Sequence, residues 1–224
     1  MTMTDVSCLL AGLTRLLDPP LLLLIWHKKT GARLYPAMIA FSVCLPVFLI
    51  GNIIRSGFSR DDPVTYYIWQ GLLFGILEEG AKYLMLRFVL PSYDSTKDAV
   101  SYGIGHGAWE DLGAGFACLG LIGTGRADPN IFWFSLFLFL EGAAFCIAVT
   151  VLIFWGIRTG RSRIMLPAAI LLHAVSSAAA GLLSESAAIT IRFLLTAGIC
   201  YAAYRCARAL RDPYADTFDF QDGM

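Results

Sequence analysis

Long hydrophobic runs alternate with short polar segments along almost the whole chain. Each run is long enough for a transmembrane helix, which needs about 20 predominantly apolar residues. The pattern predicts seven helices with short loops, at about residues 7–26, 35–54, 65–88, 98–123, 131–156, 164–183 and 187–207. The first contains Asp18-Pro19-Pro20, and because proline lacks a backbone N–H this segment should kink or break the helix.

The composition supports a membrane protein. Only 15% of the 224 residues are charged and 57% are hydrophobic, whereas a soluble domain has roughly 25% charged residues. The fold class is therefore an all-α polytopic membrane protein, with one transmembrane domain over residues 1–210 and a polar cytoplasmic tail over 211–224. The net charge is zero and no basic patch indicates a nucleic-acid partner. The six cysteines are scattered through apolar runs and are interpreted as small buried hydrophobic residues.

The distribution of Lys and Arg over the loops predicts the orientation in the bilayer. Positive charges concentrate on the cytoplasmic side of membrane proteins. Of those near helix ends, eleven fall on one side and four on the other. The richer side then faces the cytoplasm, which puts the N-terminus outside and the C-terminus inside, as an odd number of helices requires.

Ionisable residues inside these apolar runs are the candidates for chemistry. Carboxylates at the bilayer centre cost about 2.5–3.5 kcal/mol each on insertion scales, and such residues face inward and pair. Counting residues from the helix ends places a group of them at similar depths on four helices, which predicts one shared polar centre. These residues are Glu78, Glu79, Lys82, His106, Glu110, Asp111, Glu141 and His173.

The spacing within two of the helices indicates how these groups could cooperate. His106 and Glu110 are four residues apart and share a helix face, as do Glu78 and Lys82, in the favourable order for an ion pair. Glu79 points about 100° away from Glu78. Lys82 is therefore expected to pair with Glu78, leaving Glu79 as the first choice for a water-activating or metal-facing group and Glu78 as the second.

Two histidines and a carboxylate suit zinc with an open coordination position. The expected metal ligands are His106, Glu110 and His173, with Glu78 and Glu79 as catalytic residues beside them. A second possibility is a metal-free hydrolysis driven by glutamate, in which one histidine stabilises an oxyanion. Lys82, Glu141 and Asp111 are expected to support the site, and Asp111 is interpreted as a residue of the surrounding shell or of helix packing.

The segments Glu78-Glu79-Gly80-Ala81-Lys82 and Gly105-His106-Gly107-Ala108-Trp109-Glu110, together with the later His173, resemble the YhfC family of intramembrane metalloproteases. That family is similar to PrsW and to the CAAX prenyl protease and bacteriocin-processing group, which share a Glu-Glu-x-x-Arg/Lys motif and later histidines. The resemblance implies peptide-bond hydrolysis within a bacterial plasma membrane, on a membrane-associated protein or peptide.

Two hypotheses follow from the sequence. The first is an integral-membrane endopeptidase that uses a metal-bound or glutamate-activated water. The second is a non-enzymatic membrane protein, either a scaffold or a small proton-coupled transporter, since a carrier also buries carboxylates and histidine at mid-depth. Convergence of histidine nitrogens and a glutamate oxygen beside a cavity would favour the first.

Overall fold

The computed structural model describes residues 2–126 and 128–210, so the expected tail over 211–224 lies outside the described residues. The described part is helical throughout its regular structure, which confirms the all-α fold class. Its elements are α1 (Met3–Thr30), α2 (Tyr35–Ser56), α3 (Pro63–Leu84), the π-helical turn η1 (Met85–Val89), α4 (Thr96–Gly120), α5 (Ile131–Arg158), α6 (Ser162–Leu182) and α7 (Glu185–Ala209).

The helices are those of a multi-pass membrane protein. Five of them, α1, α2, α5, α6 and α7, are long and apolar enough to cross a bilayer. Helices α3 and α4 fall outside this group, and they carry most of the charged side chains inside the bundle. The membrane location is confirmed, while the topology of seven spans with the N-terminus outside stays a prediction.

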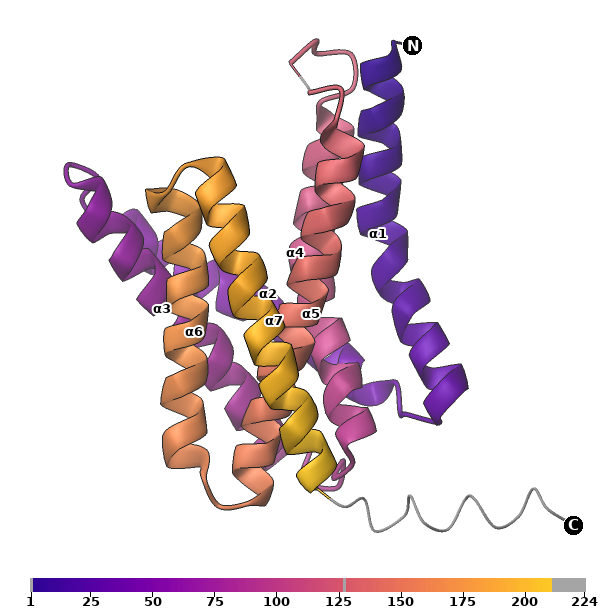
Figure 1. Cartoon of the computed structure of the whole chain (residues 1–224), viewed down its shortest axis with the longest axis vertical. Coiled ribbons are helices and arrows are strands. Elements are labelled where there is room, and N and C mark those ends of the chain that lie inside the picture. The colour runs from indigo at the N-terminus through magenta and orange to yellow at the C-terminus, as the bar shows by residue number, and fades with distance from the viewer. Residues whose placement is uncertain (1, 127, 211–224) are drawn as a thin grey trace, which may run out of the picture.

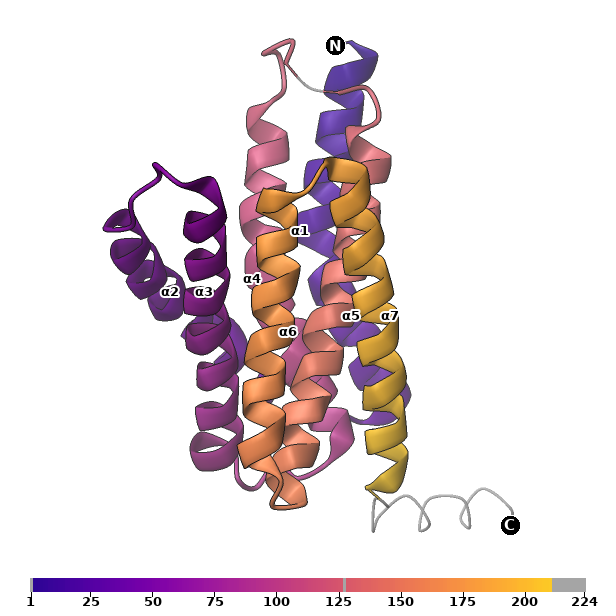
Figure 2. The same cartoon turned by 60° about the vertical axis from the view of Figure 1, so that its left-hand side comes forward.

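Helix α4 lies centrally and organises the bundle. It packs against α1, α2 and α5, whereas α3 packs mainly on α6, and α5 also contacts α7. Figure 2 shows α2 and α3 leaning away from the other helices toward the loop that joins them. The two helices expected to carry the chemistry, α3 and α4, therefore have different main packing partners.

Glycine lets two of these helix pairs approach closely. A Cβ atom built on Gly105 of α4 would lie 2.2 Å from the carbonyl oxygen of Ala37 on α2. One built on Gly75 of α3 would lie 2.7 Å from the carbonyl oxygen of Ile170 on α6. Both distances are too short for any side chain, so small residues bring the helix backbones together as expected.

Helix α1 continues through Pro19 and Pro20 without interruption. Of the two predicted outcomes, a break is not found, whereas Figure 1 shows that the helix changes direction near its middle, as a kink would cause. Proline removes a hydrogen bond and crowds the preceding turn, which bends a helix more readily than it ends one that is held by its neighbours. Here α1 packs against α4 and α5.

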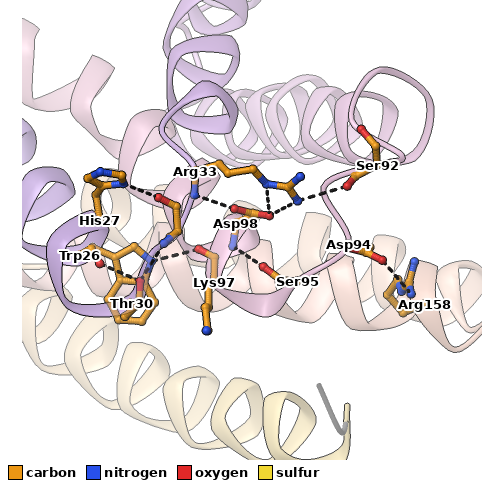
Figure 3. Close-up of polar contacts among 11 residues, drawn as sticks. Trp26, His27, Thr30, Arg33, Ser92, Asp94, Ser95, Lys97, Asp98 and Arg158 are labelled. Carbon is orange, nitrogen blue, oxygen red and sulfur yellow. Dashed lines mark hydrogen bonds and ion pairs between the residues drawn. The ribbon is translucent and has the colours of Figure 1, made fainter. Parts of the chain in front are cut away.

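A polar clamp joins the α1–α2 turn to the start of α4 (Figure 3). The backbone N–H and Nε of Arg33 each donate to the Asp98 carboxylate at 2.9 Å, and Nη2 also reaches the Ser92 carbonyl at 3.1 Å. Hydrogen bonding to Asp98 raises the pKa of Arg33 above its usual value. Trp26 of α1 adds a bond from Nε1 to the Lys97 carbonyl at 3.0 Å. These bonds fix the ends of α1, α2 and α4 relative to one another.

Candidate functional site

Glu78 of α3 meets two histidines from other helices. Its Oε2 lies 3.1 Å from Nε2 of His106 on α4 and 3.9 Å from Nε2 of His173 on α6. Both histidines are buried, and the Glu78 side chain keeps 17% of its surface exposed. The carboxylate therefore joins three helices while remaining open to one side.

Glu79 lies on a fully enclosed side of α3. Its Oε1 accepts hydrogen bonds from Lys82 Nζ and from His173 Nδ1, both at 2.8 Å. The side chains of Glu79 and Lys82 have no exposed surface. The other ring nitrogen of His173, Nε2, lies 3.9 Å from Oε2 of Glu78. Glu79 thus orients His173 and balances the charge of Lys82.

The expected pairing of Lys82 with Glu78 is wrong. The lysine bonds to Glu79, three residues before it, and Glu78 turns toward His106 instead. Both spacings place a lysine near a carboxylate on a helix surface. The rotation of α3 against α6 decides between them, because Gly75 brings the α6 backbone, and with it His173, to the Glu79 side.

A cavity of about 270 Å³ opens beside Glu78. It lies between α2, α3 and α4, and its polar lining includes Glu78, His106 and Glu110. The rest is largely apolar or aromatic, contributed by Val47, Phe48, Trp109, Leu112 and Phe116. Glu79 and His173 are absent from this lining, so of the two adjacent glutamates Glu78 is the one that a bound molecule can reach.

Two further residues from the sequence prediction, Glu110 and Asp111, differ in how they relate to this cluster. Glu110 lines the cavity one turn after His106 and makes no hydrogen bond within the described part of the chain. Asp111 pairs instead with Arg15 of α1, whose Nε donates to Ser135 of α5 at 3.0 Å. This second polar group ties α1, α4 and α5 together, in keeping with a packing role.

Glu141 also lies apart from the site. Its carboxylate accepts hydrogen bonds from Arg192 and from Thr196, the latter at 2.7 Å, and both partners are on α7. The expectation that Glu141 would share a common polar centre with the other acids is not met, because α5 turns this residue toward α7. Depth along a helix is readable from sequence, whereas the direction of a side chain depends on packing.

Cys44 is a contact that the sequence did not suggest. Its Sγ lies 3.2 Å from His106 Nδ1, and the residue lines the cavity. The two ring nitrogens of His106 are therefore engaged by Cys44 and Glu78, which fixes the plane of the imidazole. No spacing pattern links Cys44 to the other residues, since it stands alone on α2.

The donor atoms around Glu78 are of the kind that binds zinc. Nε2 atoms of two histidines face one carboxylate oxygen, and His173 holds a carboxylate through its other nitrogen, as metal-bound histidines usually do. Within residues 2–126 and 128–210, no group of three or more His, Cys, Asp or Glu side chains is arranged to hold an ion. The metal-binding roles of His106, Glu110 and His173 therefore stay predictions.

Fold and site together define a multi-pass helical membrane protein with a buried glutamate–histidine–lysine cluster beside an apolar cavity. Residues 41–122 match the family model described as YhfC intramembrane metalloprotease. That stretch runs from α2 to the loop after α4 and includes Glu78, Glu79, Lys82 and His106, while His173 lies beyond it.

The chain is also similar to a curated protein, the "Uncharacterized membrane protein YhfC" of Bacillus subtilis (strain 168). The two are 29% identical over 107 residues, which is 42% of this chain and 40% of the relative, so the match spans about two fifths of the relative's length. No solved structure matches. The predicted resemblance to the YhfC family is confirmed by these two comparisons, and the wider relation to PrsW and the CAAX prenyl protease group stays a prediction.

Proposed function

We propose that this chain is an intramembrane endopeptidase in which the carboxylate of Glu78 activates the attacking water. The observation that carries the proposal is the position of Glu78: its Oε2 contacts Nε2 of His106 at 3.1 Å and also borders the cavity between α2, α3 and α4. A general base must be able to reach both the water and a group that holds it in place. Glu78 meets both requirements.

In this mechanism Glu78 accepts a proton from water while the water oxygen attacks the carbonyl carbon of the peptide bond. The same carboxyl group then returns the proton to the leaving nitrogen, which regenerates the carboxylate. His106 orients Glu78, and His173 is oriented in turn by Glu79 and Lys82. His106 lines the same cavity as Glu78, so it is the histidine placed to stabilise developing charge on the substrate.

The family description also implies a metal ion. Zinc held by His106 and His173, with a carboxylate from Glu110 or Glu78, would supply Lewis-acid activation of the water when bound. The substrate class follows from the cavity. Phe48, Trp109 and Phe116 give it aromatic walls, which favour a membrane-associated peptide with apolar side chains next to the cleaved bond.

The scaffold alternative explains less of the site. A scaffold needs the buried Glu79–Lys82–His173 contacts, but it has no need for a glutamate that remains partly exposed beside a cavity. The transporter alternative also places carboxylates at mid-depth. A transporter cleaves no protein, so substituting Glu78 in a transporter would not change the N-termini of other membrane proteins.

The test compares protein N-termini in membranes of cells that express the wild-type chain, Glu78→Gln or Glu185→Gln. Glu185 is exposed in the first turn of α7, so its substitution removes the same charge away from the site. New N-termini should appear with the wild type and with Glu185→Gln and disappear with Glu78→Gln. Cleavage that survives in Glu78→Gln at equal protein level, or no cleavage that depends on the wild type, would overturn the proposal.

A further inference from the structure

We infer that a second cavity, beside the C-terminal end of α3, binds the phosphate group of an anionic phospholipid. The cavity measures about 310 Å³ and lies where η1, the loop before α4 and the last turns of α5 meet. It shares no lining residue with the cavity beside Glu78. Its position at the helix ends corresponds to the membrane interface, where lipid headgroups reside.

Its charged lining is suited to an anion. Two guanidinium groups, Arg87 and Arg158, and one carboxylate, Asp94, line the cavity, so positive charge is in excess. Arg158 lies 3.9 Å from Asp94, beyond hydrogen-bond range, and its side chain is 44% exposed (Figure 3). Arg87 is exposed and forms no hydrogen bond or ion pair with the described residues. Both arginines therefore keep N–H groups free. A guanidinium group can donate two parallel hydrogen bonds to two oxygens of one phosphate.

One wall of this cavity is held in place before any ligand arrives. The Arg33 guanidinium lies 4.1 Å from the centre of the Tyr93 ring, and Tyr35 stacks on the same ring at 5.6 Å. Arg33 is itself fixed by Asp98. Because this loop is already ordered, binding costs little conformational entropy.

The remaining walls favour a lipid over free phosphate. Leu86, Leu90, Phe154 and Ile157 also line the cavity. Next to them on η1, Phe88 is 66% exposed and Val89 is 49% exposed, which gives an apolar surface of the kind that contacts lipid chains. A ligand with phosphate and hydrocarbon uses both features, whereas inorganic phosphate would use the arginines alone. Basic groups at a membrane surface favour anionic lipids.

The experiment is native mass spectrometry of the full chain purified in detergent and supplied with phosphatidylglycerol, phosphatidylcholine or inorganic phosphate. The test variant is Arg87→Gln/Arg158→Gln. The matched control is Arg205→Gln/Arg208→Gln, which removes equal charge from exposed arginines near the end of α7. Among the described residues, these arginines hydrogen-bond only to tyrosines of their own helix.

Wild type and control should retain one phosphatidylglycerol, and the test variant should bind it about tenfold more weakly. Equal binding by all three proteins, or equal loss in both variants, would overturn the site. Phosphatidylcholine binding as tight as phosphatidylglycerol binding would overturn the role of charge, and release of the lipid by millimolar phosphate would overturn the choice of a lipid. If the double variant misfolds, Arg87→Gln alone decides, because this side chain forms no hydrogen bond or ion pair with the described residues that the substitution could remove.

Discussion

Lys82 donates a hydrogen bond from Nζ to Oε1 of Glu79 at 2.8 Å, and neither side chain has any exposed surface. In a charged pair this deeply buried, each side chain compensates the charge of the other, so the protein depends on both being present. Removing one partner leaves an uncompensated charge and typically costs about 3–5 kcal/mol. The same pair holds His173 through Glu79, so it links the stability of the bundle to the geometry of the site.

Replacing Lys82 with methionine should therefore destabilise the protein by about 3–5 kcal/mol. Methionine keeps most of the side-chain volume but leaves the Glu79 carboxylate without its counter-ion. The double variant Lys82→Met/Glu79→Gln should be more stable than Lys82→Met alone, because it removes the stranded charge and keeps an acceptor for His173. Thermal unfolding in detergent, followed by circular dichroism, measures both, and a double variant no more stable than the single one would contradict the pairing.

The contact between α3 and α6 should be sensitive to a single methyl group. Gly75→Ala places a Cβ atom 2.7 Å from the Ile170 carbonyl oxygen, so the backbones must move apart. Overpacking of this kind costs about 1–3 kcal/mol, and it should also lengthen the bond between His173 and Glu79. Gly80→Ala is the matched control on the same helix, since nothing lies within 4 Å of its Cβ position.

Gly80→Ala should be neutral or stabilise the protein by up to about 1 kcal/mol, because alanine favours the helix. Unfolding temperatures of the two variants under the same detergent conditions give the comparison. Equal effects of the two substitutions would show that close backbone approach at Gly75 is not what sets the α3–α6 distance.

The helices and the depth of the polar groups follow from the sequence for physical reasons. Apolar runs of about 20 residues have few alternatives to a membrane helix, and residue counts from the ends of α3 and α4 give similar depths for Glu78 and His106. The rotation of each helix does not follow, because tertiary contacts set it. Glu141 lies at a comparable depth yet faces Arg192 of α7.

The same limit explains the reversed assignment of the two glutamates. Spacing allows Lys82 to reach either of them, and only the contact of α3 with α6 selects Glu79. Cys44 illustrates a further gap: its contact with His106 joins residues 62 positions apart, and no local pattern predicts such a pair.

Metal content should depend on the histidines if the site holds zinc. Purified wild-type protein is expected to carry about one zinc ion per chain, and His106→Ala and His173→Ala should lose most of it, since each removes one of few ligands. Glu185→Gln should keep the metal, because Glu185 is exposed on α7. Elemental analysis after extensive dialysis measures the ratio. Zinc absent from every sample would leave the metal-free mechanism, in which Glu78 alone activates the water.

Glu78→Gln and Glu79→Gln should fail in different ways, although the residues are adjacent. Glu78 is partly exposed at the cavity, so its amide variant should stay within about 1 kcal/mol of wild-type stability while losing about 10²–10⁴-fold in peptidase activity, as expected for a general base. Glu79→Gln leaves the Lys82 ammonium buried without a counter-ion and should cost about 3–5 kcal/mol, with a smaller loss of activity in the protein that remains folded. Thermal unfolding and the yield of new membrane-protein N-termini, measured on both variants, separate the two roles. If Glu79→Gln were stable but inactive while Glu78→Gln stayed active, the roles of the two glutamates would be the reverse of those proposed.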